Sequence, residues 1–375
     1  MTAIAPAPYQ PDRAIPPGET IREMLEAKGM PQAELAQRMG RPANKLNEII
    51  QGKRQITADT ALELELALSL PGSFWMNLEK NYQLTKARLA QERSLQVESQ
   101  HLPRFPTKEM AKLRWIQKCD DAIAQTREML SFFGINSFEQ LKQVKSLAPA
   151  WLKSGTKRAC EYALAAWLQQ GIRQAQRIKT GKFSPSGLRA QLAELRPFTR
   201  EDPNDFEPAV VELCATHGVA VTFVPHLPKS YVNGAAYWFN EQVIIQLSLR
   251  FKWADIFWFT FFHELGHVLL HLRAKKRAFL DEKGFGRSPD IAEMEANRFA
   301  ATTLISEKDY QALLQRPYAR AEVVRQFAQQ IGVAPGIVVG RLQFDEHLQY
   351  CQLNELRSQY EWRDEDRDEA SDDAS

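Results

Sequence analysis

Residues 253–271 read WADIFWFTFFHELGHVLLH. This stretch is apolar almost throughout, which indicates a helix buried in the interior of the protein. Within it lies the pattern H-E-x-x-H, whose two histidines, His263 and His267, are four residues apart and therefore share one helix face. Both imidazoles can bind one Zn²⁺, and Glu264 beside them can act as a general base toward water at the metal. Such polar side chains in an apolar helix would be costly without a partner such as a metal.

A catalytic zinc ion generally takes three protein ligands and leaves one position open. The candidate third ligand is Glu293, which follows His267 by 26 residues at the start of a second apolar-periodic helix. Asn297 lies four residues further on the same face, where it can hydrogen-bond a ligand histidine. The alternative is that the pattern arises by chance and that one histidine is merely hydrogen-bonded.

Two further side chains near this site are less favourably placed to bind the metal. Glu295 points about 200° away from Glu293 around the helix, so we expect it to face solvent and keep it as the alternative ligand. His271 follows His267 by four residues but is displaced around the helix from His263. We therefore expect His271 to be a histidine of the rim or the core.

Upstream of the metal motif the sequence predicts strands. Residues 218–225, GVAVTFVP, form a β-branched run bounded by Gly and Pro, and residues 234–238 and 243–247 are similar short apolar runs. Helical patterns return from about residue 253 to residue 357. This part of the chain is therefore expected to be α+β, with a small sheet beside helices.

The stretch from about 205 to 345 resembles the ImmA/IrrE family of zinc metallopeptidases, which share a thermolysin-like core. Beyond HELGH, the likeness includes GVAVTFVPHLP, VIIQLSLRFKWADIFWFTFFHE, EMEANRFAATTLIS and IGVAPGIVVGRLQ. Carried over position by position, the resemblance implies that His263, His267 and Glu293 bind zinc and that Glu264 is the general base.

Residues 31–52, PQAELAQRMGRPANKLNEIIQG, predict a helix-turn-helix. Ala36 supplies the small residue where the two helices cross, and Gly40 supplies the tight turn. Leu46, Ile49 and Ile50 would then form the buried side of the second helix. Pro31 suits a first helical turn, and Thr57 can cap a further helix.

The polar positions of this motif form a candidate DNA-binding face. Asn side chains can pair with adenine edges, and Arg or Lys with guanine or phosphate. The candidate contacts are Gln32, Arg41, Asn44, Lys45, Asn47, Lys53 and Arg54. The alternative is a plain helical bundle with a solvated polar face.

Residues 17 to about 84 resemble the lambda-repressor-like (XRE) fold, specifically HigA-type antitoxins. The resemblance rests on PGETIREMLEAKGMPQAELAQRMG, QGKRQITADTALELELAL and FWMNLEKNYQL. It implies a homodimer, which would suit a palindromic DNA site. The order of the parts resembles bacterial regulators in which an antitoxin and a peptidase are fused.

The complete chain is thus expected to be mainly α, with an N-terminal helix-turn-helix bundle, a helical middle and an α+β metallopeptidase domain. We predict a DNA-binding domain at 1–95, a basic helical middle at 96–204, a zinc metallopeptidase-like domain at 205–357 and an acidic disordered tail at 358–375. Loops around 154–155 and 181–187 should interrupt the helices of the middle.

Composition supports an ordinary globular protein: 375 residues with 44% hydrophobic and 25% charged residues. The net charge of only +2 does not indicate a general affinity for nucleic acid, so DNA contacts must come from a local patch of basic residues. Four single cysteines without a C-x-x-C pair favour reduced thiols in a cytoplasmic protein. The N-terminus has no signal-peptide pattern, and the most apolar stretch is too short to span a membrane.

Charge is nevertheless unevenly distributed along the chain. Residues 101–200 hold 18 Lys and Arg against 7 Asp and Glu, whereas residues 361–375 hold 8 acids against 2 Arg. The basic middle could assist DNA binding, bind an acidic partner or be a solvated linker. The tail has almost no apolar residue to bury; it either maintains solubility or associates with the basic middle.

These features predict a transcriptional regulator of the antitoxin type that binds double-stranded DNA, including its own promoter. Its zinc-dependent endopeptidase domain would hydrolyse a regulatory protein, or the chain itself. One alternative is a non-enzymatic regulator whose zinc domain senses a ligand or binds a toxin. Another is a housekeeping peptidase whose N-terminal bundle only mediates dimerisation.

Overall fold

The computed structural model describes residues 11–144, 160–272, 278–281 and 290–362. The chain divides into two compact units, Met1–Gln100 and His101–Ser375. The proposed boundaries at residues 95, 204 and 357 stay predictions. Of the tail predicted at 358–375, residues 363–375 lie outside the described residues, as does the predicted loop at 154–155. The first residues of that tail are packed instead of free, because Tyr360 is 7% exposed and its hydroxyl accepts a hydrogen bond from the Trp258 indole.

The first unit is a helical bundle. Its helices are α1 (Pro17–Lys28), α2 (Gln32–Arg38), α3 (Ala43–Ile50), α4 (Ala58–Leu68) and α5 (Gly72–Glu98). Gly40 adopts a left-handed conformation with φ of +63° after α2, as the turn requires. The hydroxyl of Thr57 accepts a hydrogen bond from the Thr60 backbone N–H, which confirms the predicted cap of α4.

The core of this bundle is built from the predicted apolar face. Ala36 is 2% exposed at the crossing of α2 and α3, and Leu46, Ile49 and Ile50 are buried on α3. Trp75 of α5 is buried in the same cluster. The helix-turn-helix geometry expected from the sequence is therefore present in the backbone and in the core.

The second unit begins with a series of α-helices and 3₁₀ helices, the latter labelled η. They are η1 (Ser99–Arg104), α6 (Thr107–Lys112), α7 (Ala122–Phe133), η2 (Phe138–Gln143), α9 (Glu161–Ala175), α10 (Pro185–Ala190), α11 (Leu192–Leu195) and η3 (Arg196–Arg200). Helix α10 lies partly within the loop predicted at 181–187. The Ser184 hydroxyl caps this helix by accepting a hydrogen bond from the Gly187 backbone N–H, and Pro185 occupies its first turn. The helix therefore begins two residues before the predicted end of the loop.

Helix α12 (Pro203–Thr216) leads into a four-stranded sheet, in the order β1 (Val219–Phe223), β3 (Gln242–Leu247), β2 (Gly234–Phe239) and β4 (Ala278–Asp281). β1 and β3 are parallel, with Val221 opposite Ile245. β2 is antiparallel to both β3 and β4. The first three strands confirm the prediction, and β4 is an addition that the sequence pattern did not indicate.

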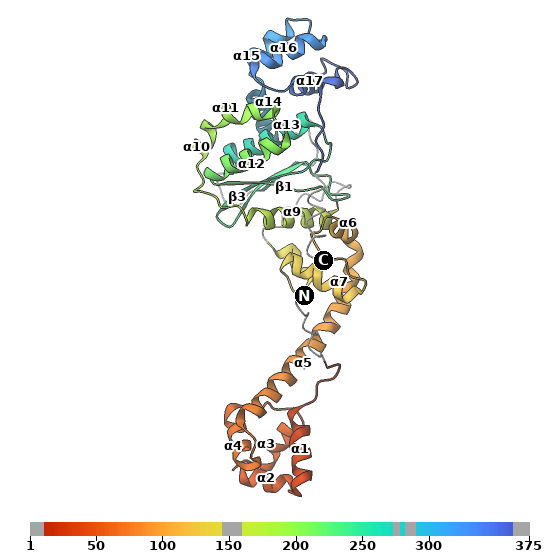
Figure 1. The fold of residues 1–375 in the computed structure, drawn as a ribbon, viewed down its shortest axis with the longest axis vertical. Helices are drawn as coiled ribbons and strands as arrows, with labels where there is room; N and C mark the ends of the chain where they lie inside the picture. Colours follow the sequence, from red (N-terminus) through yellow and green to blue (C-terminus); the bar gives the residue numbers. More distant parts are fainter. Residues whose placement is uncertain (1–10, 145–159, 273–277, 282–289, 363–375) are drawn as a thin grey trace, which may run out of the picture. The chain divides into compact units, whose positions relative to one another are not determined.

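Helices cover both faces of this sheet (Figure 1). Helix α9 packs against β1 and β3 on one face, while α12 and α13 (Ala254–Leu270) lie on the other. On the α9 side, the Trp167 indole donates to the Val224 carbonyl, and the Gln246 amide donates to the Trp167 carbonyl. Helix α9 falls within the predicted middle segment, yet it packs directly on the sheet.

The remaining helices are α14 (Ile291–Leu304), α15 (Glu307–Leu314), α16 (Ala321–Ile331), α17 (Pro335–Phe344) and η4 (Asn354–Leu356). Arg357 reaches back to the first turn of α13, where it makes two hydrogen bonds of 3.0 and 2.9 Å to the buried carboxylate of Asp255. Among the described residues, no helix is long and apolar enough to cross a membrane.

Candidate functional site

The candidate site lies in the second unit, where α13 packs against α14. Gly266 lies at this contact, because a Cβ atom there would be 3.0 Å from the Phe299 ring and 3.3 Å from the Ala296 Cα. A larger residue would force the two helices apart. The glycine within the H-E-x-x-H motif therefore permits the close approach that brings side chains of α14 to the two histidines.

Three predicted ligands meet across this contact. The Nε2 atoms of His263 and His267 are 3.0 Å apart. Glu293 Oε2 lies 3.3 Å from His263 Nε2, and Glu293 Oε1 lies 3.6 Å from His267 Nε2. One ligand atom from each of the three residues lies within 4.8 Å of the others, the grouping that a metal ion needs.

Asn297 orients the first histidine. Its side-chain oxygen lies 2.9 Å from His263 Nδ1. An oxygen can only accept there, so Nδ1 carries the proton and Nε2 is left with a lone pair directed at the site. The structure thus places Asn297 where the sequence predicted it.

The second histidine is oriented by a longer chain of contacts. His267 Nδ1 lies 3.0 Å from His271 Nδ1, and His271 Nε2 lies 2.9 Å from a Glu295 oxygen. The carboxylate accepts from His271 Nε2, so His271 Nδ1 is the acceptor for a proton on His267 Nδ1. His267 Nε2 is then free to bind a metal. Glu295 is 58% exposed, as expected, but it acts on the site through His271.

The general-base candidate is fully buried beside the ligands. Glu264 is 0% exposed on α13. The first residue of β2, Gly234, lies against it, because a Cβ at Gly234 would be 2.8 Å from a Glu264 carboxylate oxygen. The backbone of β2 therefore passes this carboxylate at a position where a side chain would clash with it.

Burial and charge set the protonation of the site. Burial lowers the pKa of His267 to about 4, so its imidazole is neutral near pH 7. For Glu293, burial acts to raise the pKa, but hydrogen bonds and charge from the two histidines outweigh it and hold the pKa well below its usual range. The neutral His267 imidazole and the ionised Glu293 carboxylate are in forms that bind Zn²⁺, which takes nitrogen and oxygen ligands of this kind.

Phe279 of β4 completes the wall of the site. Its ring stacks on the His267 imidazole, with centroids 4.0 Å apart and planes 14° from parallel. Sequence reasoning missed this residue and the contact between His267 and His271. The four-residue spacing of the two histidines could have indicated the latter, whereas no local pattern marks β4.

The candidate DNA-binding residues lie on α2, on α3 and in the turns before and after α3. Gln32, Asn44, Asn47, Lys53 and Arg54 are exposed there. Arg41 and Lys45, which should be exposed if they contact DNA, are half-buried. The role of these residues in DNA binding stays a prediction.

Carboxylates partly neutralise this face. Arg41 is ion-paired with Glu63 of α4, which leaves its side chain 21% exposed. Glu48 lies 3.2 Å from the Lys45 ammonium and 3.8 Å from the Arg54 guanidinium. Exposed pairs of this kind are weak and can exchange for phosphate contacts. Only the tertiary structure reveals the Arg41–Glu63 pair, since 22 residues separate its members.

Comparison with protein families identifies two matching regions. Residues 214–343 match the IrrE N-terminal-like domain of the Peptidase_M78 family. Residues 21–75 match the helix-turn-helix family. The first region contains the three candidate ligands and Glu264, and the second contains α2 and α3.

Individual proteins resemble part of the chain. Virulence-associated protein I of Dichelobacter nodosus is 37% identical over 75 residues, which cover 20% of this chain and 69% of that protein. The Pseudomonas aeruginosa antitoxin HigA, solved with the higBA promoter, is 34% identical over 23% of this chain and 95% of its own, with a TM-score of 0.22. A HigA-family antidote protein from Coxiella burnetii is 33% identical over 23% and 95%, with a TM-score of 0.21.

Proposed function

The chain belongs to the fused regulators that join a HigA-type helix-turn-helix domain to an IrrE-like domain of the M78 peptidase family. From this premise we propose that it is a DNA-binding transcriptional regulator with a zinc-dependent endopeptidase domain. The observation that carries the enzymatic part is the convergence of His263, His267 and Glu293 beside a buried Glu264. The peptidase would cut a regulatory protein, or the chain itself.

The donor set supports zinc, and the packing of the H-E-x-x-H helix against a helix that bears the third ligand supports a thermolysin-like arrangement. His263 and His267 would bind through Nε2, and Glu293 through its carboxylate. A bound Zn²⁺ would polarise the peptide carbonyl and make a water molecule more acidic.

The side chains of this domain would move the proton. Glu264 takes a proton from the attacking water onto a carboxylate oxygen and passes it to the nitrogen of the leaving amine. Asn297 holds His263, and the His271–Glu295 pair holds His267, so that neither imidazole rotates during the reaction. The buried position of Glu264 limits exchange of this proton with bulk water.

The helix-turn-helix supports the DNA-binding part of the proposal. Asn44 and Asn47 are exposed on α3, and Lys53 and Arg54 follow it where they can hold phosphates. We propose that the protein is a cytoplasmic homodimer that binds a palindromic site in its own promoter. A two-fold axis in the protein would then match that of the site.

The test compares the wild type with Glu264→Gln, both loaded with one zinc per chain. Each is incubated with an extract of the source cells, and new peptide N-termini are identified by mass spectrometry. The wild type should generate a small set of termini that Glu264→Gln does not, while both proteins bind the promoter fragment equally in a gel shift. This variant removes the base but keeps all three ligands, so the zinc content should not change.

Two results would contradict the proposal. Identical termini from both proteins would leave no role for Glu264 as a base and would favour a zinc domain that senses a ligand or binds a toxin. Absence of any promoter binding would remove the regulator and leave a peptidase whose bundle only mediates association.

A further inference from the structure

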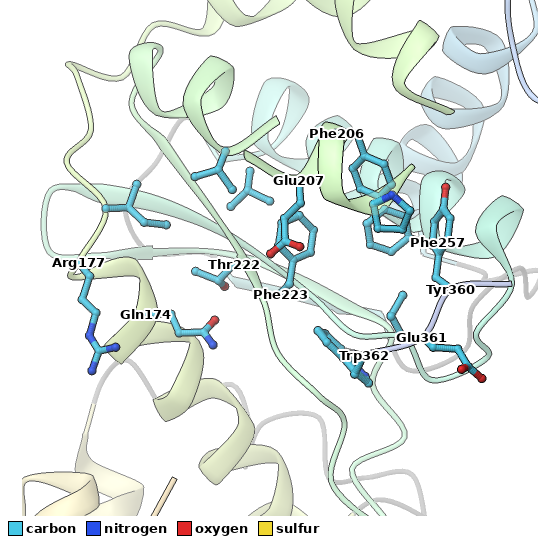
Figure 2. A pocket seen from close by; sticks show the side chains of 15 residues that line it. Gln174, Arg177, Phe206, Glu207, Thr222, Phe223, Phe257, Tyr360, Glu361 and Trp362 are labelled. Carbon is cyan, nitrogen blue, oxygen red and sulfur yellow. The ribbon is translucent and has the colours of Figure 1, made fainter. Parts of the chain in front are cut away.

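A groove in the second unit lies apart from the metal ligands. It consists of two adjoining cavities of about 400 and 590 Å³, and the residues that line both are Gln174, Arg177, Phe223, Leu249, Tyr360, Glu361 and Trp362. Figure 2 shows the first cavity, with Gln174 and Arg177 on one side and Glu361 and Trp362 on the other. We call this combined space the basic groove.

Positive charge dominates the lining of the basic groove. Its cations are Lys112, Arg114, Arg173, Arg177 and Lys252, and its carboxylates are Glu207 and Glu361. Lys252 is paired with Glu361 at 3.2 Å. Among the ion pairs of the described residues, none involves Arg114 or Arg177. The groove therefore offers charge that is not compensated within the described part of the chain.

The floor of the groove holds an unused hydrogen-bonding group. Thr222 of β1 lines the first cavity and is 2% exposed, and its hydroxyl has no hydrogen-bond partner among the described residues. Buried hydroxyls are nearly always paired, so this one indicates an occupant with a hydrogen-bond acceptor. A carboxylate would satisfy both this donor and the excess positive charge.

In the sequence, an acidic segment directly follows a residue that lines the groove. Trp362 lines both cavities, and the next residues, 363–375, read RDEDRDEASDDAS, with seven acids and two arginines. We propose that segment 363–375 binds in the basic groove of its own chain. The proposal unites the two charged regions that the DNA-binding and peptidase functions leave unused, and it is independent of both functions.

The length of the segment agrees with this placement. Thirteen residues extend to about 40 Å, whereas a five-residue strand such as β1 spans about 17 Å. The segment can therefore pass along the groove from Trp362 toward Arg173 or toward Thr222 without strain. Because its acids are close together, several can approach the cations at once, and tethering raises their effective concentration there.

The test measures binding of a fluorescein-labelled peptide of residues 363–375 by fluorescence anisotropy. The acceptor is the full chain with its seven tail acids changed to the corresponding amides, so that its own segment no longer competes. We expect the peptide to bind this acceptor at least about tenfold more tightly than it binds the wild type, whose tethered acidic segment occupies the groove. Binding should weaken markedly between low and high salt.

Charge reversals locate the site. Arg173→Glu with Arg177→Glu in the acceptor should weaken binding by about tenfold or more. Lys112→Glu with Arg114→Glu, at the α6 end, provides a second pair in case the first impairs folding. Lys308→Glu with Arg325→Glu, exposed on α15 and α16, is the matched control and should leave binding unchanged.

Several results would overturn the proposal. These are the absence of peptide binding, equal affinity of the wild type and the acceptor, equal binding of a peptide whose acids are amides, and an equal loss in the control pair. Retention of full affinity in the folded groove variants would do the same.

Discussion

The separate roles of the two glutamates on α14 are open to direct measurement. We predict that Glu293→Gln abolishes tight zinc binding and that Glu295→Gln only weakens it. The two residues are two positions apart on one helix, and both changes remove a single charge while they retain the shape of the side chain. The pair is thus a matched comparison of a ligand with a residue that positions a ligand.

The expected magnitudes follow from the contacts. Glu293 is 17% exposed, with its oxygens 3.3 and 3.6 Å from the two Nε2 atoms. Opposite unit charges about 4 Å apart interact by about 4 kcal/mol at an effective dielectric constant near 20, and a divalent ion interacts more strongly. After desolvation is subtracted, we expect a loss of at least about a hundredfold, or about 2.7 kcal/mol. Glu295 acts through His271 from an exposed position, so about tenfold is expected.

Competition with a chromophoric chelator gives the zinc affinity of each purified variant near pH 7. Circular dichroism of the metal-free proteins serves as the control for folding. If Glu295→Gln lost more zinc affinity than Glu293→Gln, the assignment of the third ligand would be wrong. If both variants retained wild-type affinity, the three convergent side chains would not be the metal site.

Three further predictions concern DNA, pH and the core. Asn44→Ala should weaken promoter binding by about 1–3 kcal/mol in a gel shift, whereas the control variant Lys80→Ala on α5 should bind like the wild type. Equal affinities of Asn44→Ala and the wild type would exclude a base contact by Asn44. Between pH 7 and pH 4, the chelator-treated wild type should lose about 3 kcal/mol more unfolding free energy than His267→Asn loses. The reason is that this histidine takes up a proton near pH 6.5 in the unfolded chain, but only near its pKa of about 4 in the folded protein. The measurement is denaturant titration of both proteins at each pH, and an equal loss in the two would refute the prediction. Arg357→Met should lower the unfolding free energy by about 3–5 kcal/mol, since it leaves the Asp255 carboxylate buried without its ion pair, and a second change, Asp255→Asn, should restore much of it in thermal melts.

Local patterns were sufficient for the parts of the molecule that depend on neighbouring residues. The four-residue spacing of His263 and His267 placed both imidazoles on one face of α13, because the geometry of a helix is the same in any context. The turn at Gly40 and the cap at Thr57 follow equally local rules. Glu293 and Asn297 were identified in the same way, from the apolar face of α14.

The sequence by itself therefore determined the two families of domain, the helix that carries the metal motif and three of the strands. The tertiary structure alone decided which distant groups meet: Phe279 on His267, Arg357 on Asp255, Arg41 on Glu63 and the basic groove. β4 is only four residues long and is defined by its pairing with β2. The physical reason is that periodicity reports the face on which a side chain lies, whereas long-range contacts depend on how separate elements pack against one another.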